Sequence, residues 1–272
     1  MTRHYALRTT MCAIVACGVV VAAADLQNEA LGAYIEYANG ATRLFVDRVC
    51  SGRIGTSASR SAVGSSDGEV VVGPAREGGI LSIPGGLVHH WIGSTFIAGV
   101  TMQDALDVSY DYGDYRSVYK PVIASTLLSR DGSSFRVRLR IKESGGGLSA
   151  VLDVTSRVQY VFVDDRRAYS IASSEEIREI RNDGSPNERS LPAGHDSGYL
   201  WRAATFNYLE ARDDGVFVET EALGLSRRFP PLLGWIIEPT ARRLGRSSVE
   251  RSLRDFKQAV NKRARTRQQA HE

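Results

Sequence analysis

The sequence predicts a single α+β domain in which a curved antiparallel sheet wraps around a long C-terminal helix, with an extra N-terminal helix. Apolar and polar residues alternate along several stretches between residues 87 and 225, which is typical of half-buried strands. The stretch that follows carries apolar residues at helical spacing. One antiparallel sheet with helices on one side is the α+β arrangement that buries such faces.

The composition is that of an ordinary globular protein. Of 272 residues, 43% are hydrophobic and 24% are charged, and a chain of this size can bury a core without disulfides or metals. Removal of the basic leader described next lowers the net charge from +3 to +1. A nearly neutral domain argues against nucleic acid as a partner.

Residues 1–24 are predicted to be a secretory signal peptide. Arg3 and Arg8 form a short basic leader, an uncharged apolar run follows, and an Ala-x-Ala arrangement ends it where a signal peptidase needs small residues. The run is too short to cross a bilayer comfortably. We therefore expect an exported protein, periplasmic or secreted. A loose lipobox ending at Cys17 offers the alternative of a lipid-anchored N-terminus.

Two segments precede the main domain. Residues 25–50 are predicted to form an amphipathic helix, because their apolar residues recur every three or four positions. Residues 51–79 are rich in Gly and Ser and are predicted to be a linker, with one short strand near residues 69–72. Cleavage of the leader leaves Cys50 as the single cysteine, so no intrachain disulfide is expected.

The main domain is predicted over residues 80–263 and begins with a strand and two helices. Residues 87–98 are rich in β-branched and aromatic residues, which favours a strand. Thr101 and Asp104 have the spacing of a capping box at the start of a helical stretch that reaches residue 119. Gly113 is expected to divide that stretch into two short helices.

Strands are predicted for the middle of the domain. Residues 134–142 alternate apolar side chains with Arg or Lys, which places the apolar set inward and the basic set in water. Further strands are predicted over residues 150–163, with Phe162 on the apolar face, and over residues 168–180. Residues 199–225 are predicted to form the last hairpin.

The end of the chain is predicted to be helical. Residues 232–244 form one expected helix, and Ser247 with Glu250 has the spacing of a capping box that would start a second one. Residues 264–272 are expected to be a basic, polar tail that frays. The second helix carries an apolar stripe consisting of Val249, Leu253, Phe256 and Val260.

Four motifs resemble the START-like, or SRPBCC, superfamily of polyketide cyclases, dehydrases and lipid-transport proteins. They are PGGLVHHWIG at residues 84–93, YDYGDY at residues 110–115 ahead of Tyr119-Lys120-Pro121, ETEALGLSR at residues 219–227, and Gly234-Trp235. Over residues 80–262 the chain resembles exported bacterial members. The resemblance implies a helix-grip fold with an internal cavity for lipids, sterols, polyketides or other apolar ligands.

The resemblance assigns no catalytic residue, metal or cofactor. No catalytic motif of the enzymatic branches and nothing like a Rieske domain stands in the sequence. It does imply which side chains could line the cavity. These candidates are His89, His90, Trp91, Tyr110, Tyr112, Tyr115, Tyr119, Arg202, Phe206, Glu219, Glu221 and Trp235.

The adjacent histidines suggest a metal site at first sight. Neighbours on a strand point to opposite faces, however, so His89 and His90 cannot easily reach one ion. We expect one ring to face the cavity or core as a hydrogen-bonded structural residue, and we predict no metal site.

The charged candidates Arg202, Glu219 and Glu221 lie in one predicted hairpin. If their side chains point inward they need partners, and Arg202 paired with either glutamate at the cavity wall could hold a polar head group. The interpretation that we favour places all three on the solvent face, because charged residues are mostly exposed.

Two further features could serve a ligand carrier. The four candidate tyrosines have helical spacing, which is ordinarily core packing, but the short helices flank the cavity mouth in the implied fold, and tyrosine suits amphipathic ligands. From Glu238 onward, the chain carries ten basic residues against four acidic ones. They form either a solvated face or a transient contact with anionic membrane. The basic residues are Arg242, Arg243, Arg246, Arg251, Arg254, Lys257, Lys262, Arg263, Arg265 and Arg267.

Together these features favour an exported, noncatalytic protein that binds an apolar or amphipathic molecule of the lipid or isoprenoid class. Two alternatives stay open. One is a cyclase-like or hydrolase-like enzyme that uses His89, His90, a gate tyrosine or Glu219 as acid or base in the same cavity. The other is an interaction protein whose interior is filled by side chains.

Overall fold

The computed structural model describes residues 24–54, 68–145, 148–228 and 231–270. The predicted signal peptide lies outside the described residues, apart from Ala24. Residues 231–238 are described as helix without their side chains, so the predicted cavity role of Trp235 also lies outside the description.

The centre of the molecule is one antiparallel sheet of ten strands. Its main path runs β2-β4-β12-β11-β8-β7-β6-β5, while β3 pairs with β4 and β9 with β8. In chain order the strands are β2 (Val71–Pro74), β3 (Ile80–Ile83), β4 (Gly86–Ala98), β5 (Val122–Asp131), β6 (Ser134–Gly145), β7 (Leu148–Phe162), β8 (Arg167–Arg181), β9 (Arg189–Ser190), β11 (Arg202–Arg212) and β12 (Gly215–Arg227).

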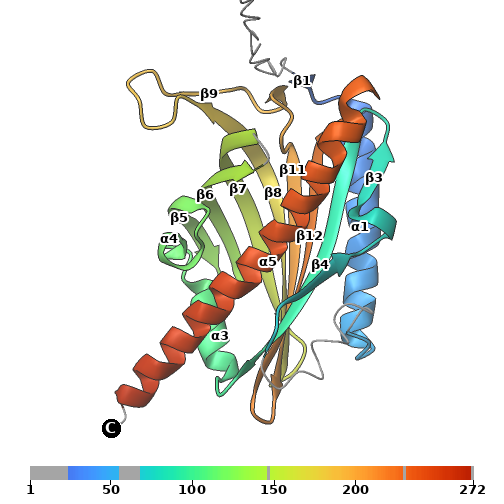
Figure 1. Cartoon of the computed structure of the whole chain (residues 1–272). Coiled ribbons are helices and arrows are strands. Elements are labelled where there is room, and N and C mark those ends of the chain that lie inside the picture. The colour runs from blue at the N-terminus through green and yellow to red at the C-terminus, as the bar shows by residue number, and fades with distance from the viewer. Residues whose placement is uncertain (1–23, 55–67, 146–147, 229–230, 271–272) are drawn as a thin grey trace, which may run out of the picture.

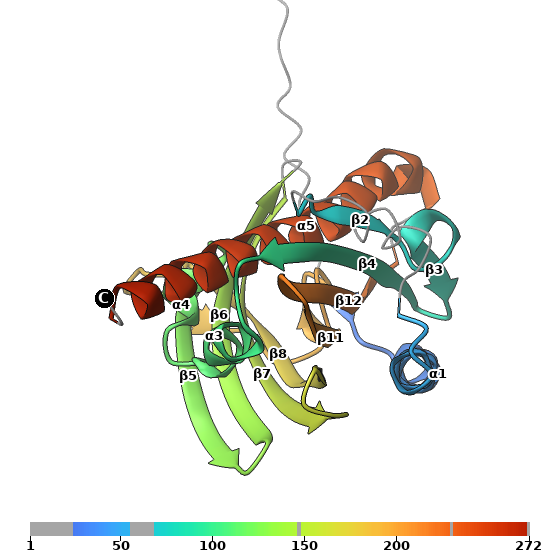
Figure 2. The ribbon, with the colours of Figure 1, turned by 90° about the horizontal axis from the view of Figure 1, so that it is seen from below.

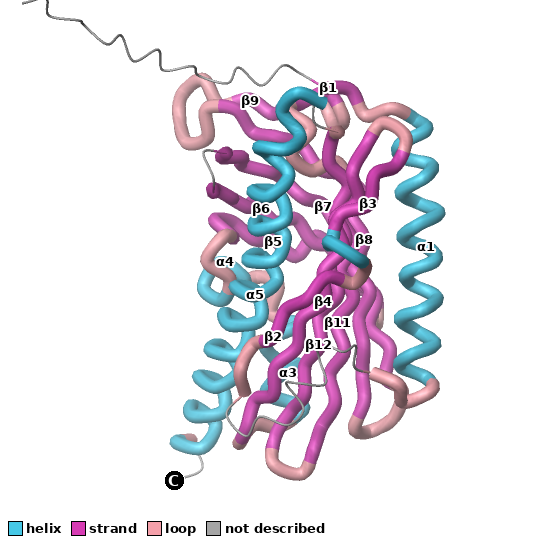
Figure 3. Tube along the Cα trace, turned by 45° about the vertical axis from the view of Figure 1, so that its right-hand side comes forward, coloured by secondary structure: helices cyan, strands magenta, loops and turns pink. Residues whose placement is uncertain are grey.

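Four α-helices accompany the sheet in the described residues. They are α1 (Asn28–Cys50), α3 (Met102–Tyr110), α4 (Tyr115–Val118) and α5 (Pro231–Gln269). The long helix α5 crosses the sheet diagonally (Figure 1). Figure 2 shows the curvature of the sheet; α4 contacts β5, and both α3 and α4 contact α5. Figure 3 shows α1 on the side of the sheet opposite α5.

This architecture confirms the predicted fold class. The curved antiparallel sheet, the long C-terminal helix and the extra N-terminal helix are all present, in the arrangement of a helix-grip fold. A short 3-10 turn, η1 (Glu77–Gly79), and a small two-stranded sheet of β1 (Ala24–Asp25) with β10 (His195–Asp196) complete it. Within the described residues, no helix is long and apolar enough to cross a membrane.

The strand pattern of β6 follows from its sequence. Phe135 and Val137 are buried, whereas Arg136 and Arg138 between and beside them are exposed. The alternation predicted from period two is therefore confirmed. The turn before β6 requires Gly132, whose φ of 54° lies in the left-handed region that favours glycine.

The start of α3 is also as predicted. The Thr101 hydroxyl accepts a hydrogen bond from the backbone N–H of Asp104 at 3.2 Å, and the Asp104 carboxylate accepts one from the backbone N–H of Thr101 at 2.8 Å. This reciprocal pair satisfies two donors that the first helical turn leaves without partners.

Three local predictions were wrong. α5 is one continuous helix that contains Pro239, and Ser247 does not start a helix; its hydroxyl donates to the Leu244 carbonyl within the helix at 3.1 Å. Packing of the apolar stripe of α5 against the sheet stabilises the helix across this position. Ala264 is buried, so the packed face extends into the predicted tail. Phe162 is 55% exposed because it is the last residue of β7.

The sheet has a core on each side. On one side α5 and α3 pack on β4 and β12, and on the other α1 packs on β4, β11 and β12. The contact of α5 with β4 is close, since a Cβ added at Gly93 would stand 2.7 Å from a terminal carbon of Leu253. Strand β2, which lies within the predicted linker, pairs with β4 next to this contact.

Candidate functional site

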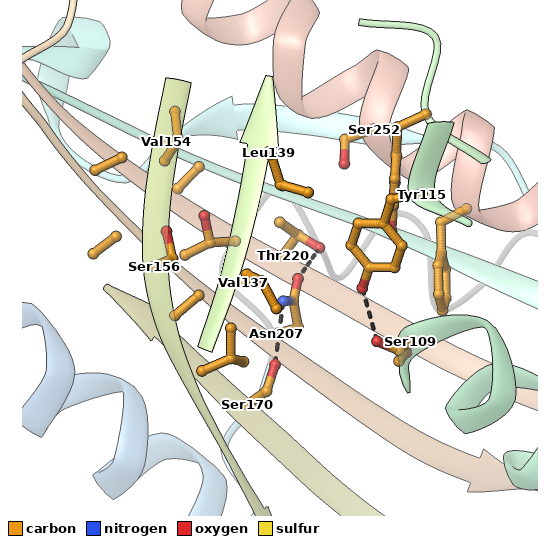
Figure 4. A pocket seen from close by; sticks show the side chains of 18 of the residues that line it. Ser109, Tyr115, Val137, Leu139, Val154, Ser156, Ser170, Asn207, Thr220 and Ser252 are labelled. Carbon is orange, nitrogen blue, oxygen red and sulfur yellow. Dashed lines mark hydrogen bonds between the residues drawn. The ribbon is translucent and has the colours of Figure 1, made fainter. Parts of the chain in front are cut away.

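A cavity of about 340 Å³ lies between the sheet and α5. Its walls come from the inward-facing residues of β6, β7, β8, β11 and β12, from α5, and from the segment that carries α3 and α4. Figure 4 shows Val137, Leu139 and Val154 pointing into it. Leu253 and Phe256 of α5 complete an apolar lining.

A row of three polar side chains, one from each of three neighbouring strands, crosses this lining. Asn207 of β11 stands directly opposite Thr220 of β12 on one side and Ser170 of β8 on the other. The Thr220 hydroxyl donates to the Asn207 side-chain oxygen at 2.9 Å, and the Asn207 amide nitrogen donates to the Ser170 hydroxyl at 3.3 Å (Figure 4). The cavity wall therefore carries a row of neutral hydrogen-bonding groups.

Charge is nearly absent from the wall. Among the described residues that line the cavity, Glu143 is the only one with an ionisable acidic or basic side chain other than tyrosine. Its carboxylate accepts a hydrogen bond from the Arg251 guanidinium at 2.8 Å. The one carboxylate is therefore already paired, and none of the described lining residues offers a cation to a ligand.

Tyrosines form the end of the cavity next to α3 and α4. Tyr112, Tyr115 and Tyr119 line it, and Tyr160 of β7 joins them. The Tyr112 and Tyr160 hydroxyls lie 2.7 Å apart, while the Tyr115 hydroxyl donates to the Ser109 carbonyl at 2.7 Å. Burial raises the pKa of Tyr112 to about 12 and raises those of Tyr115, Tyr119 and Tyr160 as well. These hydroxyls stay protonated at neutral pH.

Tyr110 lies just behind this end. Its ring stacks on Phe135 with centroids 5.4 Å apart and meets Tyr160 edge-on at 4.6 Å, and it is not among the lining residues. It supports the tyrosine cluster from outside the cavity.

Glu219 and Glu221 lie on the other face of β12. They are 0% and 4% exposed, so the favoured solvent-facing position was wrong. Their partner is Arg48 of α1, whose guanidinium contacts both carboxylates, at 3.1 Å in the case of Glu219. Because Thr220 takes the cavity face, its two neighbours must take the face that α1 covers.

The histidines lie outside the cavity as well. His90 faces α1, where one ring nitrogen hydrogen-bonds the Tyr37 hydroxyl at 2.7 Å and the other contacts Glu221 at 2.6 Å. His89 hydrogen-bonds the Ser226 hydroxyl at 2.8 Å. Burial, together with the positive charge of Arg242 on α5, lowers the pKa of His89 to about 4.

The remaining candidates also pack elsewhere. Trp91 lies against α5, where a Cβ added at Gly245 would stand 2.5 Å from its indole nitrogen. Phe206 is buried against Phe45 of α1, with ring centroids 5.2 Å apart. Arg202 donates to the Trp201 carbonyl at 2.8 Å and pairs with neither glutamate. Among the described residues, no group of three His, Cys, Asp or Glu side chains could hold a metal ion.

Sequence reasoning missed Asn207, Ser170 and Thr220. The sequence did hold signals for two of them. Asn207 interrupts the apolar residues of a predicted strand, and Thr220 stands between two glutamates in the sequence. The pairing of β11 between β8 and β12, which brings the three together, is a tertiary feature.

No family model and no curated protein matches the chain. Among solved structures, human StAR-related lipid transfer protein 5 is similar at 16% identity and a TM-score of 0.46, covering 87% of this chain and 99% of that one. A STAR-related lipid transfer protein fragment from Xanthomonas axonopodis is similar at 17% identity and a TM-score of 0.43, covering 69% and 99%. The Zhui aromatase/cyclase from Streptomyces sp. R1128 is similar at 12% identity and a TM-score of 0.40, covering 65% and 95%.

Two of these proteins are named lipid transfer proteins and the third an aromatase/cyclase. With identities of 12% to 17%, the similarity concerns the fold alone. What the chain itself binds is therefore considered from its cavity.

Proposed function

We propose that this protein binds an apolar or amphipathic small molecule, of the lipid or isoprenoid class, in the cavity between the sheet and α5. The observation that carries the proposal is the cavity itself, about 340 Å³ with largely apolar walls and a few convergent polar groups. Ligand pockets in proteins have about 300–1,000 Å³ and this kind of lining. The empty volume argues against the alternative of an interior filled by side chains.

The lining supports binding without catalysis. An acid or base needs a titratable group within reach of the ligand. Of the acids and bases that the enzyme alternative offers, His89, His90 and Glu219 are not among the lining residues, and the lining carboxylate of Glu143 is held by Arg251. The tyrosines have raised pKa values, which makes them poor bases at neutral pH.

We further propose that the protein works outside the cytoplasm and collects its ligand at a membrane. The predicted leader supports export. On α5, Arg251, Arg254 and Arg263 form ion pairs within the protein, whereas Arg243 and Lys262 are exposed and could contact anionic head groups. Fewer basic residues of this helix are therefore available for membrane contact than the ten counted in the sequence.

The test is native mass spectrometry of the full chain expressed with its leader in a bacterial host. We expect the mass of a chain cleaved after Ala24, together with a stoichiometric adduct that can be extracted into organic solvent and identified. An adduct-free protein that also gives no thermal shift with extracted lipids would contradict the binding function. A full-length mass in the cytoplasmic fraction would contradict export alone.

A further inference from the structure

We propose that Asn207 recognises the polar end of the ligand, and that this ligand is an uncharged molecule carrying a hydroxyl or carbonyl group on an apolar body. The inference rests on the proposed binding function and narrows the chemical class of the ligand. Three features of the cavity carry it: the hydrogen-bonding capacity left on Asn207, the absence of an unpaired charge among the described lining residues, and the apolar surroundings.

The first step is the position of Asn207. It lies on β11 in the middle of the sheet, with Thr205 and Leu209 two residues away also lining the cavity. Thr220 and Ser170, its direct cross-strand neighbours, are 7% and 3% exposed and hold the amide from both sides. Two hydrogen bonds to buried neighbours fix the rotamer, so the amide is preorganised in the wall (Figure 4).

The second step is the capacity that remains. A side-chain amide has two N–H donors and an oxygen with two lone pairs. The bond to Ser170 uses one N–H, and the bond from Thr220 uses one lone pair. One donor and one acceptor are left for a ligand. A hydroxyl can use both, and a carbonyl can use the donor.

The third step excludes a charged head group. A carboxylate or phosphate buried here would need a cation, and the only charged side chain in the described lining is the acidic Glu143. The tyrosines are held neutral by their raised pKa values. Burial of an unpaired ion is far more costly than burial of a hydroxyl that finds a hydrogen bond. The neutral amide therefore selects a neutral partner.

The fourth step concerns the rest of the ligand. The cavity that Asn207 lines is otherwise walled by apolar side chains such as Val137, Leu139 and Val154 of the sheet and Leu253 of α5. These side chains offer no hydrogen bond, and they favour an apolar body through contact and exclusion of water. One polar point in an apolar cavity orients such a molecule.

The experiment compares wild type with Asn207→Leu, in which a side chain of similar size lacks the amide. The fluorescent neutral probe N-phenyl-1-naphthylamine is displaced at pH 7 by four compounds with the same ring system: naphthalene, 2-naphthol, 2-acetylnaphthalene and 2-naphthoate. Asn187→Leu, the same substitution at an exposed residue that does not line the cavity, is the matched control.

We expect Asn207→Leu to lower the affinity for 2-naphthol and 2-acetylnaphthalene about tenfold, the loss typical of one or two neutral hydrogen bonds. The affinity for naphthalene should be unchanged. Unchanged naphthalene binding shows that the variant is folded. In wild type, 2-naphthoate should bind at least about tenfold more weakly than 2-naphthol, because its charge has no partner. Asn187→Leu should bind all four compounds as wild type does.

The opposing results separate two failures. If wild type binds the probe but Asn207→Leu changes all neutral compounds equally or none, or if 2-naphthoate binds as well as 2-naphthol, the assignment of Asn207 is wrong and the binding function stands. If wild type binds neither the probe nor any compound, the binding function itself is wrong, and this inference fails with it.

Discussion

Arg48 of α1 holds two carboxylates that have almost no contact with water. Its side chain is 20% exposed, while Glu219 and Glu221 are 0% and 4% exposed. We expect Arg48→Ala to lower the free energy of unfolding by about 3–5 kcal/mol, because removal of one partner leaves buried charges without compensation. Urea denaturation measures the change.

A surface pair supplies the control for Arg48. Arg166 contacts Asp213 at 3.2 Å, but their side chains are 60% and 99% exposed. Arg166→Ala should change the free energy of unfolding by less than about 1 kcal/mol, since exposed ion pairs contribute little. Equal effects of the two substitutions would contradict the role that we give to Arg48.

His89 should make stability depend on pH. Its pKa is lowered from 6.5 to about 4 by burial and by Arg242, so the unfolded chain binds a proton in a pH range where the folded chain does not. By linkage, the contribution of His89 to the free energy of unfolding is fully present above its pKa in the unfolded chain. It is lost as the pH drops from about 6.5 toward about 4.

The measurement is urea denaturation of wild type and His89→Gln at pH 7 and pH 5. We expect wild type to lose about 2 kcal/mol more than the variant between these pH values, since each pKa unit corresponds to about 1.4 kcal/mol. Parallel losses in both proteins would mean that another group causes the pH dependence.

At the scale of elements, the seating of α5 on β4 depends on Gly93. A Cβ there would stand 2.7 Å from a terminal carbon of Leu253 and 2.9 Å from one of Val249. We expect Gly93→Ala to lower the free energy of unfolding by about 1–3 kcal/mol through overpacking. Gly40, within α1, has nothing within 4 Å of an added Cβ.

Gly40→Ala should therefore raise the free energy of unfolding by about 0.5–1 kcal/mol, because alanine loses less conformational freedom in a helix. Thermal or urea unfolding of both variants gives the comparison. A stabilising Gly93→Ala would show that α5 can shift on the sheet at little cost.

The elements themselves were largely predictable from local pattern. Residues 134–142 alternate because one face of β6 is buried, and Thr101 with Asp104 caps α3 through bonds between neighbours in the chain. Where the element depends on distant packing, prediction failed: α5 passes through the capping-box spacing at Ser247 and continues to Gln269.

For the molecule as a whole, one substitution should fill part of the cavity with a larger side chain. Ser156 of β7 points into it (Figure 4), whereas its neighbour Arg157 is exposed on the other face. We expect Ser156→Phe to weaken binding of a neutral naphthalene probe at least about tenfold, because the ring occupies the space that the ligand needs. Probe titration and thermal unfolding are the measurements.

Arg157→Phe is the control on the same strand, and it should bind the probe as wild type does. Its surface ion pair with Glu175 contributes little to stability. Unimpaired probe binding by Ser156→Phe would place the probe outside the cavity and would contradict the proposed site.

The sequence by itself determined the α+β class, the order of helices and strands and the alternation of faces, because these depend on neighbours a few residues apart. The resemblance implied that four tyrosines flank the cavity mouth; Tyr112, Tyr115 and Tyr119 line the cavity, whereas Tyr110 does not. The tertiary structure alone decided which face each strand turns to the cavity. A shift by one residue exchanges Thr220 with Glu219 or Glu221, and only α1, packed on the opposite side through Arg48, makes the glutamates structural. For the same reason Asn207, Ser170 and Thr220 become one group only after three strands pair.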